Sequence, residues 1–263
     1  MKKLPKISVI TITYNSEKLL ERAVRSVIDQ DYPELEYIIV DGGSTDGTIE
    51  IIKKYEDRIS KWVSEPDNGI SDAFNKGIRM ASGDIIGITN SDDGLLPGAL
   101  AAVADAFEDD IDVYRRNVML WQEDKNTRVI EKPTMKFRFN RLYSICHQST
   151  FVTKKAYEKY GVFNVSLKYT MDYDLLLRFQ NSGAKSKHID KTLAFYSLGG
   201  ACINSDKKKL SDEVAKVMKL NGATKLQIAE YRFFRSIKHT IQKIVPKEVI
   251  LKIRHGKNKN ITA

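Results

Sequence analysis

The sequence predicts an α/β fold with a mostly parallel central sheet, and three observations support that prediction. Short runs rich in β-branched residues alternate with amphipathic segments of about ten to fifteen residues, which is the pattern of βαβ units. Gly, Asn, Ser and Asp follow the apolar runs, where turns are needed. The chain has 263 residues, enough for one large domain with an appendage. We therefore expect right-handed crossovers between parallel strands, flanked by helices.

The first two elements follow from local composition. Residues 7–13 form a predicted strand because Ile, Val and Thr dominate them. Residues 14–16 break that strand, and Ser16 suits the N-cap of a helix. The apolar residues that follow recur at helical spacing, namely Leu19, Leu20, Ala23, Val27 and Ile28.

The alternation of strands and helices continues to residue 89. Residues 37–40 form the second predicted strand, and the apolar residues from 49 to 55 indicate a helix after it. A third strand contains Trp62 and Val63, and residues 73–81 form the next helix. The buried-type run 85–89 is the fourth strand.

The second half of the chain is less regular from about residue 114 onward. Residues 116–121, 127–130 and 148–152 are predicted strands without clear helices between them, so this half is expected to be mixed. Residues 172–180 again have a helical pattern, with Leu175, Leu176 and Phe179 on the apolar side.

Bulk composition is that of an ordinary globular protein, with 42% hydrophobic and 29% charged residues. No apolar run approaches the roughly 20 residues that span a bilayer. The basic N-terminus runs directly into the first strand, so we do not expect a signal peptide. Cys146 and Cys202 are too few for a disulfide framework or a zinc site and fit a reduced, cytoplasmic chain.

The net charge of +9 comes from the C-terminal tail. Residues 206–263 contain 15 Lys and Arg against 5 Asp and Glu, whereas the preceding residues balance at −1. Such a tail implies an anionic partner surface, either nucleic acid or lipid headgroups. From Lys225 onward, apolar residues recur every three or four positions between basic ones, up to Pro246. This amphipathic helix either packs on the domain or docks on a membrane surface.

Acidic residues gather where the predicted strands end. Asp92 and Asp93 follow the fourth strand, and Asp41 closes the second. The carboxyl ends of parallel strands meet at one sheet edge, where ligands bind in open α/β sheets. Adjacent carboxylates there suit a hard divalent cation, and such a cation suits a diphosphate. Taken alone, residues 90–93 are better explained as a simple Asp-rich turn, and the metal interpretation depends on the residues before and after them.

Several motifs occur in order and carry a family resemblance. They are Ser-Val-Ile-Thr-Ile-Thr-Tyr-Asn at 8–15, Val-Asp-Gly-Gly-Ser-Thr-Asp-Gly at 40–47, Asp-Asn-Gly at 67–69 with Asp-Ala-Phe-Asn-Lys-Gly at 72–77, Asn-Ser-Asp-Asp at 90–93, His-Gln-Ser-Thr-Phe at 147–151 and Met-Asp-Tyr-Asp-Leu at 171–175. Through them, residues 7–205 resemble the inverting family 2 glycosyltransferases of the GT-A fold, in particular the subgroup that builds bacterial surface polysaccharides.

The resemblance implies a domain over residues 1–205, followed by a basic helical extension at 206–263. Residues 1–114 would bind a nucleotide-sugar, for which the resemblance implies UDP ahead of GDP or dTDP, and residues 115–205 would bind the acceptor. The enzyme would be a hexosyltransferase that works at the cytoplasmic side, where the tail would hold it peripherally on the inner face of the membrane. A glycan or a lipid-linked glycan is the implied acceptor.

Roles for single residues also come from the resemblance. Tyr14 would stack near the base, Asp41 would hold the base or ribose, and Asp92 would lie near the ribose and donor sugar. Asp93 would bind the divalent metal, Mn²⁺ or Mg²⁺, and Asp172 would be the general base for an inverting displacement. The remaining implied contacts to the donor are Thr13, Asn15, Asp67, Asn75 and Lys76, and those on the acceptor side are His147 and Gln148.

Ordinary structural roles compete with some of these assignments. Asp174 is expected to pair with Arg178 four residues on rather than to act in the site. Lys76 and Asn75 are weaker candidates because a helix position explains both. His147 is a candidate for a core histidine as well as for an acceptor or phosphate contact.

Departures from the family pattern narrow the prediction. Gly42 replaces the second Asp of the usual Val-Asp-Asp-Gly-Ser, and Asn90 replaces the first Asp of the metal motif. Met171 precedes the expected base where many members have Glu. The Gln-x-x-Arg-Trp element of processive synthases is absent, which favours transfer of one sugar per encounter.

Two other functions are less consistent with the sequence. A nucleotidyltransferase needs a Gly-rich basic loop after the first strand, where this chain has Tyr14-Asn15-Ser16-Glu17. A non-catalytic protein that binds a nucleotide-sugar, or a nucleic acid through its tail, is the alternative from another class. No nucleic-acid reading motif is recognised, so we do not expect that partner. The sequence does not specify the donor sugar, the acceptor, the linkage or the oligomeric state.

Overall fold

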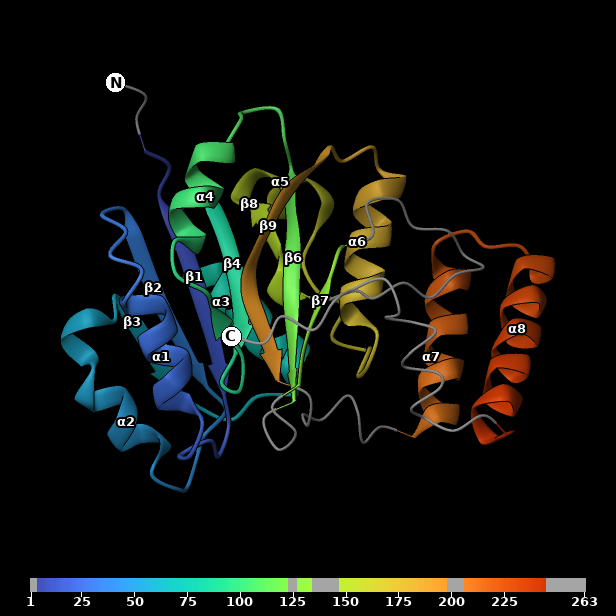
Figure 1. Ribbon diagram of the computed structural model, residues 1–263, viewed down its shortest axis with the longest axis horizontal. Coiled ribbons are helices and arrows are strands. Elements are labelled where there is room, and N and C mark those ends of the chain that lie inside the picture. The colour runs from blue at the N-terminus through green and yellow to red at the C-terminus, as the bar shows by residue number, and fades with distance from the viewer. Residues whose placement is uncertain (1–3, 123–126, 134–146, 198–205, 245–263) are drawn as a thin grey trace.

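The computed structural model describes residues 4–122, 127–133, 147–197 and 206–244. Within these ranges the chain forms one nine-stranded sheet with the strand order β3-β2-β1-β4-β8-β6-β9-β5, to which β7 adds by pairing with β6. Helices cover both faces of this sheet, and a pair of helices, α7 and α8, lies beside it beyond α6 (Figure 1). The predicted α/β class is therefore confirmed.

The first half of the sheet is parallel. Its strands are β1 (Ile7–Thr13), β2 (Leu35–Asp41), β3 (Lys61–Ser64) and β4 (Ile85–Asn90), joined by the helices α1 (Leu20–Ile28), α2 (Thr48–Lys54) and α3 (Ile70–Met80) and by the short 3₁₀ turn η1 (Glu56–Arg58). Thr13 lies opposite Asp41, and Ile12 lies opposite Asn90. The register thus brings the carboxyl ends of β1, β2 and β4 to one edge.

The second half of the sheet is mixed, as the sequence predicted. It contains β5 (Gly94–Leu95), α4 (Ala99–Ala106), β6 (Val113–Gln122), β7 (Thr127–Glu131), η3 (His147–Ser149), β8 (Thr150–Thr153), α5 (Lys154–Tyr160), α6 (Met171–Asn181) and β9 (Ser186–Ser197). Strand β8 runs antiparallel between β4 and β6, and β9 runs parallel to β6. The sequence did not predict α4, α5 or β9.

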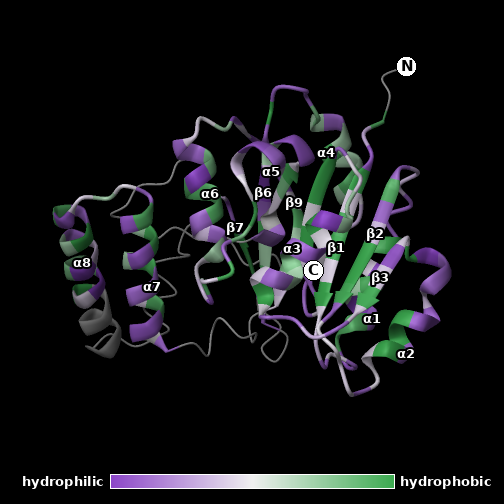
Figure 2. Ribbon diagram, turned by 180° about the vertical axis from the view of Figure 1, so that it is seen from behind, coloured by the Kyte–Doolittle hydropathy of each residue, from purple (hydrophilic) through white to green (hydrophobic). Residues whose placement is uncertain are grey.

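Two apolar cores fill the two faces of the sheet because successive strand residues point to opposite sides. On β1, Ile10 packs with the α3, α5 and α6 side, whereas Val9 packs with the α1 and α4 side. Figure 2 shows mostly hydrophobic strands in the sheet and a mixture of hydrophobic and polar residues on the helices that flank it. A Cβ on Gly77 would lie 2.4 Å from Ile10, so this glycine allows α3 to approach β1 closely.

The C-terminal helices α7 (Lys207–Leu220) and α8 (Lys225–Ile244) pack on each other and continue the first core. Val214, Val217 and Met218 of α7 and Tyr231 of α8 are buried in that core. None of the helices in the described ranges is both long and apolar enough to cross a membrane.

One local prediction was wrong. Ser16 does not cap α1 with its side chain, because the helix begins at Leu20 after a turn in which the Ser16 carbonyl accepts from the Leu19 and Leu20 amides. The Ser16 hydroxyl instead bonds to the Tyr14 carbonyl and to the Ser91 hydroxyl. It therefore connects the loops that follow β1 and β4.

A buried carboxylate ties the parallel strands at the opposite end of the sheet. Glu36 accepts hydrogen bonds from the Ser8 hydroxyl at 2.6 Å, the Ser82 amide at 2.7 Å and the Lys61 ammonium at 2.9 Å. Burial alone would raise the pKa of Glu36, but these hydrogen bonds lower it to about 2. The ionised form is therefore the one that the fold stabilises.

Glu36→Gln is expected to lower the free energy of unfolding by about 3 kcal/mol at pH 7, since the pKa of Glu36 is lowered from 4.5 to about 2 and one pKa unit corresponds to about 1.4 kcal/mol. The folded pKa is depressed, so this stabilisation is present above the unfolded value near 4.5 and is lost as the pH falls toward 2. Urea unfolding at pH 7 and pH 3 measures it, with the exposed Glu34→Gln as control. An equal loss at both pH values would contradict an origin in ionisation.

Candidate functional site

The candidate site lies at the edge where β1, β2 and β4 end. Asp41 ends β2, Asn90 ends β4, and the Asp92–Asp93 pair follows directly. Asp172 comes from the first turn of α6, in the mixed half of the molecule. Each of these residues was expected at the site, and the structure determines which of their side chains are open to a ligand.

Both oxygens of the Asp41 carboxylate accept hydrogen bonds from nearby groups of the protein. It is fully buried, and its Oδ2 accepts from the amides of Gly43 at 3.0 Å and Ser44 at 2.9 Å and from the Ser64 hydroxyl at 2.7 Å. Oδ1 accepts from the Ser44 hydroxyl at 2.5 Å. The expected direct contact from Asp41 to a base or ribose does not fit this geometry. Asp41 shapes the loop that a ligand would meet.

Asn15 joins the loops after β1 and β2. Its backbone has φ 46°, in the left-handed region that Asn tolerates better than most residues. Its amide donates to the Ser44 hydroxyl at 2.8 Å, and its side-chain oxygen accepts from the Thr45 amide at 2.9 Å. Asn15 therefore helps to fix the conformation of the loops at this edge of the sheet.

Tyr14, Gly42 and Asp67 form an open cradle. Tyr14 is 61% exposed although it directly follows a buried strand. A Cβ on Gly42 would lie 2.7 Å from the Asp67 Oδ2 and 3.4 Å from the Tyr14 ring, so the glycine keeps space between them. Asp67 uses Oδ1 to accept from the Gly69 amide. An aromatic face beside an available carboxylate oxygen suits a planar ligand with N–H donors. Thr13, just before Tyr14, contributes a buried hydroxyl that finds no hydrogen-bond partner within the described ranges.

The structure gives Asn75 and Lys76 structural partners. The Asn75 side chain is buried, donates to the Phe163 carbonyl at 2.9 Å and accepts from the Phe163 amide at 3.0 Å. Lys76 donates to the Pro66 carbonyl at 2.9 Å and pairs with Glu65 at 2.9 Å. The expectation that both contact a donor does not fit these bonds. Asn75 joins α3 to the 163 region, and Lys76 fixes the loop that carries Asp67.

Asp92 and Asp93 differ in accessibility. Asp93 is fully buried, its Oδ1 accepts from the Ser197 amide at 3.0 Å, and its Oδ2 accepts from the side-chain amides of Gln148 at 2.5 Å and Asn90 at 3.0 Å. Asp92 is only partly buried, and its carboxylate has a hydrogen bond from its own backbone amide. The expected metal contact by Asp93 therefore conflicts with the geometry, which leaves Asp92 as the available carboxylate.

The electrostatics of this pair favour a cation. Burial, and next the charge of Asp92, raise the pKa of Asp93 to about 7. Burial also raises the pKa of Asp92. Two adjacent carboxylates with raised pKa values are stabilised in their ionised form by a nearby positive charge.

Arg22 was missed by sequence reasoning. From α1 its guanidinium donates to the Asp92 carbonyl at 2.9 Å and to the Ser197 hydroxyl at 3.2 Å, and it lies 4.8 Å from the centre of the Trp121 ring. The Ser197 hydroxyl in turn donates to the Asp92 carbonyl at 2.6 Å. Together they fix the turn that presents Asp92. Neither residue lies in a motif, and only the folded contacts identify them.

The short turn η3 carries two consecutive contacts to the site. His147 Nδ1 lies 2.8 Å from Asp172 Oδ2, and the next residue, Gln148, donates to Asp93. Burial lowers the pKa of His147, but the charges of Asp172, Asp93 and Asp92 outweigh it and raise the value. The two residues expected on the acceptor side thus connect Asp172 with the Asp92–Asp93 pair.

The neighbouring pair on α6 behaves as expected. Arg178 Nε donates to Asp174 Oδ2 at 2.8 Å, and the Asn221 side chain donates to the other Asp174 oxygen at 3.2 Å. Asp174 therefore has a structural role, which confirms the prediction of an ion pair.

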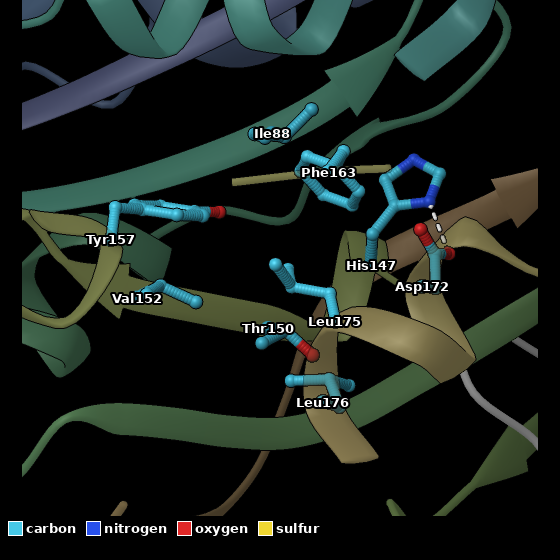
Figure 3. A pocket seen from close by; sticks show the side chains of 9 residues that line it. All are labelled: Ile88, His147, Thr150, Val152, Tyr157, Phe163, Asp172, Leu175 and Leu176. Carbon is cyan, nitrogen blue, oxygen red and sulfur yellow. Dashed lines mark hydrogen bonds and ion pairs between the residues drawn. The ribbon is translucent and has the colours of Figure 1, made fainter. Parts of the chain in front are cut away.

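A small pocket lies beneath Asp172 and His147. Figure 3 shows these two side chains at one end and largely apolar residues around the rest of it. The lining residues are Ile88, His147, Thr150, Val152, Tyr157, Phe163, Asp172, Leu175 and Leu176. Asp172 Oδ1 and His147 Nε2 are buried here without a hydrogen-bond partner in the part of the chain that the structure describes. These two atoms are the ones available to a reacting group.

The residues at the end of β4 fit a divalent metal that is shared with a ligand. Among the described residues, no three His, Cys, Asp or Glu side chains cluster as a metal site. Asn90 Oδ1 is nevertheless buried without a partner, and the Asp92 carboxylate is available. Mg²⁺ is commonly held by one or two protein oxygens, substrate phosphates and water, so this donor set fits such an ion.

Comparison with known proteins identifies the fold and the family profile. Residues 8–161 match the profile described as "Glycosyl transferase family 2". Crystal structures of a *Staphylococcus aureus* protein, TarS residues 1–349, superpose with a TM-score of 0.68 at 20% identity, over 92% of this chain and 76% of that one. A mannosyltransferase of *Pyrobaculum calidifontis*, PcManGT, in complex with GDP-Man and Mn²⁺, has a TM-score of 0.64 at 16% identity, over 97% and 80% of the two chains.

Curated relatives have higher sequence identity but are longer. A chondroitin synthase of *Escherichia coli* is 29% identical over 245 residues, which are 89% of this chain and 35% of that protein. A hyaluronan synthase of *Pasteurella multocida* is 30% identical over 72% of this chain and 20% of its own length. The chain therefore spans about a third or less of these relatives.

The difference between a fully hydrogen-bonded carboxylate, Asp41, and a carboxylate with an available oxygen, Asp67, is testable. Asp41→Asn replaces an acceptor of four hydrogen bonds and is expected to lower the free energy of unfolding by about 2–3 kcal/mol, because buried donors lose their charged partner. Asp67→Asn, which keeps an oxygen for the Gly69 amide, is expected to cost less than about 1 kcal/mol. Urea unfolding compares the two, and equal losses would contradict the distinction.

Proposed function

This chain belongs to glycosyl transferase family 2, and we propose that it transfers one sugar from a nucleotide-sugar to a hydroxyl of a glycan acceptor with inversion. The observation that carries the proposal is the pair of bonds from η3. His147 contacts Asp172 and Gln148 contacts Asp93, so an available carboxylate on α6 shares one site with the carboxylates at the end of β4. Such a site has a donor side and an acceptor side, formed by residues 1–114 and 115–205.

The open cradle would bind the nucleotide. Tyr14 would stack on the base, and the free oxygen of Asp67 would accept from its N–H groups. UDP is the proposed nucleotide. A TarS crystal structure contains UDP-GlcNAc, and the *Pyrobaculum* mannosyltransferase contains GDP-Man, so solved relatives of this fold hold both kinds of donor.

A divalent metal, Mn²⁺ or Mg²⁺, would be held by Asp92, with Asn90 Oδ1 as a second oxygen. When bound, the ion neutralises the charge that develops on the departing diphosphate. Asp93 would act indirectly. Its hydrogen bonds with Asn90, Gln148 and Ser197 would fix the turn that presents the Asp92 carboxylate to the ion.

Asp172 would act as the general base. Its unpartnered Oδ1 would accept the proton of the acceptor hydroxyl while that oxygen attacks the anomeric carbon. The bond from the anomeric carbon to the phosphate oxygen breaks, and the electron pair leaves with the nucleoside diphosphate. A positioned base of this kind typically contributes about 10² to 10⁴ in rate. A single displacement needs no protein nucleophile.

A role in bacterial polysaccharide biosynthesis is the biological part of the proposal. Relatives named as chondroitin and hyaluronan synthases support it, although this chain matches only part of each. Another relative, of *Campylobacter jejuni*, is named as a glucosyltransferase acting on an undecaprenol-linked glycan and is 36% identical over 38% of this chain. A lipid-linked acceptor is therefore proposed. A non-catalytic nucleotide-sugar binding protein is the alternative, and it predicts binding without turnover.

The outer face of α8 supports a contact with an anionic membrane, on the inner cytoplasmic leaflet in this proposal. Leu226, Phe233, Phe234 and Ile237 are exposed, at 77%, 63%, 52% and 40%. Figure 2 shows hydrophobic and polar residues side by side on this helix. Residues 206–263 carry 15 Lys and Arg against 5 Asp and Glu, and each basic residue near an anionic surface contributes about 1 kcal/mol. The apolar side chains would enter the headgroup layer, with basic residues around them.

The metal assignment predicts different behaviour for two adjacent variants. Asp92→Asn is expected to weaken Mn²⁺-dependent binding of UDP at least about tenfold without loss of stability, because it removes the available carboxylate. Asp93→Asn is expected to lower the thermal midpoint of unfolding while Mn²⁺ still strengthens the binding of UDP. Calorimetric titration of UDP with and without Mn²⁺ measures the affinities, and thermal unfolding measures the midpoints. Retained Mn²⁺ dependence in Asp92→Asn, with loss in Asp93→Asn, would reverse the assignment.

The same titration tests the function itself. Binding of UDP-, GDP- and dTDP-sugars is measured for the wild type and for Asp172→Asn. Turnover is then measured as release of the nucleoside diphosphate. We expect the variant to bind donor but to lose turnover by at least about 10². Equal turnover in both proteins, or no binding of any nucleotide to the wild type, would contradict the proposed transferase.

Membrane contact is tested with the full chain and vesicles of phosphatidylglycerol and phosphatidylcholine. Phe233→Ser with Phe234→Ser is expected to reduce vesicle binding about tenfold, since both rings lose their apolar burial. Val165→Ser, at an exposed residue outside α7 and α8, is the matched control and should bind as the wild type. Unchanged binding by the double variant, or equal binding to pure phosphatidylcholine, would contradict the proposal.

A further inference from the structure

We infer that His147 is a positioning residue for Asp172: its Nδ1–H holds one carboxylate oxygen so that the other faces the acceptor hydroxyl. The inference deepens the proposed function and rests on Asp172 as the base. His147 Nδ1 lies 2.8 Å from Asp172 Oδ2, while Asp172 Oδ1 is buried and has no hydrogen-bond partner among the described residues. An ionised carboxylate accepts only, so the shared proton belongs to Nδ1 and His147 is the donor.

The His147 ring is fixed by packing. It meets the Phe74 ring edge to face, with centroids 5.0 Å apart and planes at 62°. Its side chain and that of Asp172 are 16% and 18% exposed, so little water competes for the bond between them. A hydrogen bond in such surroundings holds its partners more firmly than one on an open surface.

The backbone of η3 is fixed as well. Arg116 is buried on β6 and donates from Nη2 to the Gln148 carbonyl at 2.6 Å. The Gln148 side chain donates to Asp93 on the opposite side of the site. Because His147 precedes this anchored residue, the imidazole has a defined position relative to both carboxylates.

Helix α6 is held from its other side by α7. Glu213 Oε1 accepts from the backbone amides of Lys168, Tyr169 and Thr170 at 2.8 to 2.9 Å, immediately before the helix begins at Met171. Asp172 therefore has a fixed main chain, and its carboxylate orientation depends on the bond from His147. Precise orientation of a base is what a positioned donor supplies.

The experiment compares His147→Asn, which retains a donor near the Nδ1 position, with His147→Ala, which removes it. We expect His147→Ala to lower kcat about 10- to 100-fold, with donor affinity within about twofold of the wild type. His147→Asn should recover most of that loss.

His188 provides the matched control. Its Nε2 lies 3.0 Å from the Asn117 side-chain oxygen on the neighbouring strand, outside the site. His188→Ala should leave kcat unchanged. If His147→Asn is as inactive as His147→Ala, the inference is overturned, because that result would indicate that the imidazole itself accepts the proton. Wild-type kcat in His147→Ala would also overturn it.

A spectroscopic measurement separates this inference from the proposed function. Histidine ¹⁵N spectra of the protein without substrate should show a protonated Nδ1 on His147 whose signal shifts in Asp172→Asn. If the signal is present and the wild type has no transferase activity with any donor, the proposed function fails and the catalytic role of His147 fails with it. If the wild type is active and the signal does not respond to Asp172→Asn, the positioning inference alone fails.

Discussion

The buried carboxylate of Asp93 holds the site together. It accepts from Asn90 of the strand it follows, from Gln148, which is 55 residues away, and from Ser197, which is 104 residues away. Burying an ionised carboxylate is costly unless donors surround it, and here three segments supply them. The compensation is incomplete, because burial and the neighbouring Asp92 still raise the pKa of Asp93 to about 7. The edge of the parallel sheet and the mixed half of the molecule thus meet at a group that a nearby cation would stabilise further.

The acidic residues of the site divide into two groups according to what the fold leaves free. Asp41 and Asp93 have no exposed surface and accept hydrogen bonds on both oxygens. Asp67, Asp92 and Asp172 each retain an oxygen that no described side chain or amide uses. The first group determines the shape of the loops and the second group remains for ligands. The division follows from ordinary hydrogen-bond satisfaction, because a fully buried carboxylate must find all its donors within the protein.

Much of the fold was predictable, because hydrophobic periodicity is local. The strands 7–13 and 85–89, the helix at 172–180 and the Asp174–Arg178 pair all follow from residues within one or two turns of each other. The residues that gather at the sheet edge were also predictable, since parallel strands align their ends. Strand β9 was not, because its alternation is interrupted where it shifts register against Arg116 and Asn117.

The detailed roles within the site were less predictable because they depend on distant partners. Asp92 and Asp93 are adjacent and chemically identical. Only the contacts from Gln148 and Ser197 distinguish the buried, hydrogen-bonded carboxylate of Asp93 from the more accessible carboxylate of Asp92. Asn75 resembles a ligand contact in sequence, yet Phe163, 88 residues on, occupies both its donor and its acceptor. Arg22 belongs to no motif and acquires its role from Trp121 and Ser197.

The C-terminal helices α7 and α8 contribute to the packing around α6, the helix that carries the proposed base Asp172. Glu213 of α7 binds the three amides that precede α6, and Asn221 at the end of α7 donates to Asp174 in the first turn of α6. Tyr231 of α8 is buried in the same core as Leu175 and Leu176. Residues 206–244 are therefore part of the packing that positions Asp172, and removing them would disturb the site as well as the exposed face of α8. Because the apolar side chains on that outer face lie outside this core, they are the part of α8 free to contact a surface while the inner face keeps α6 in place.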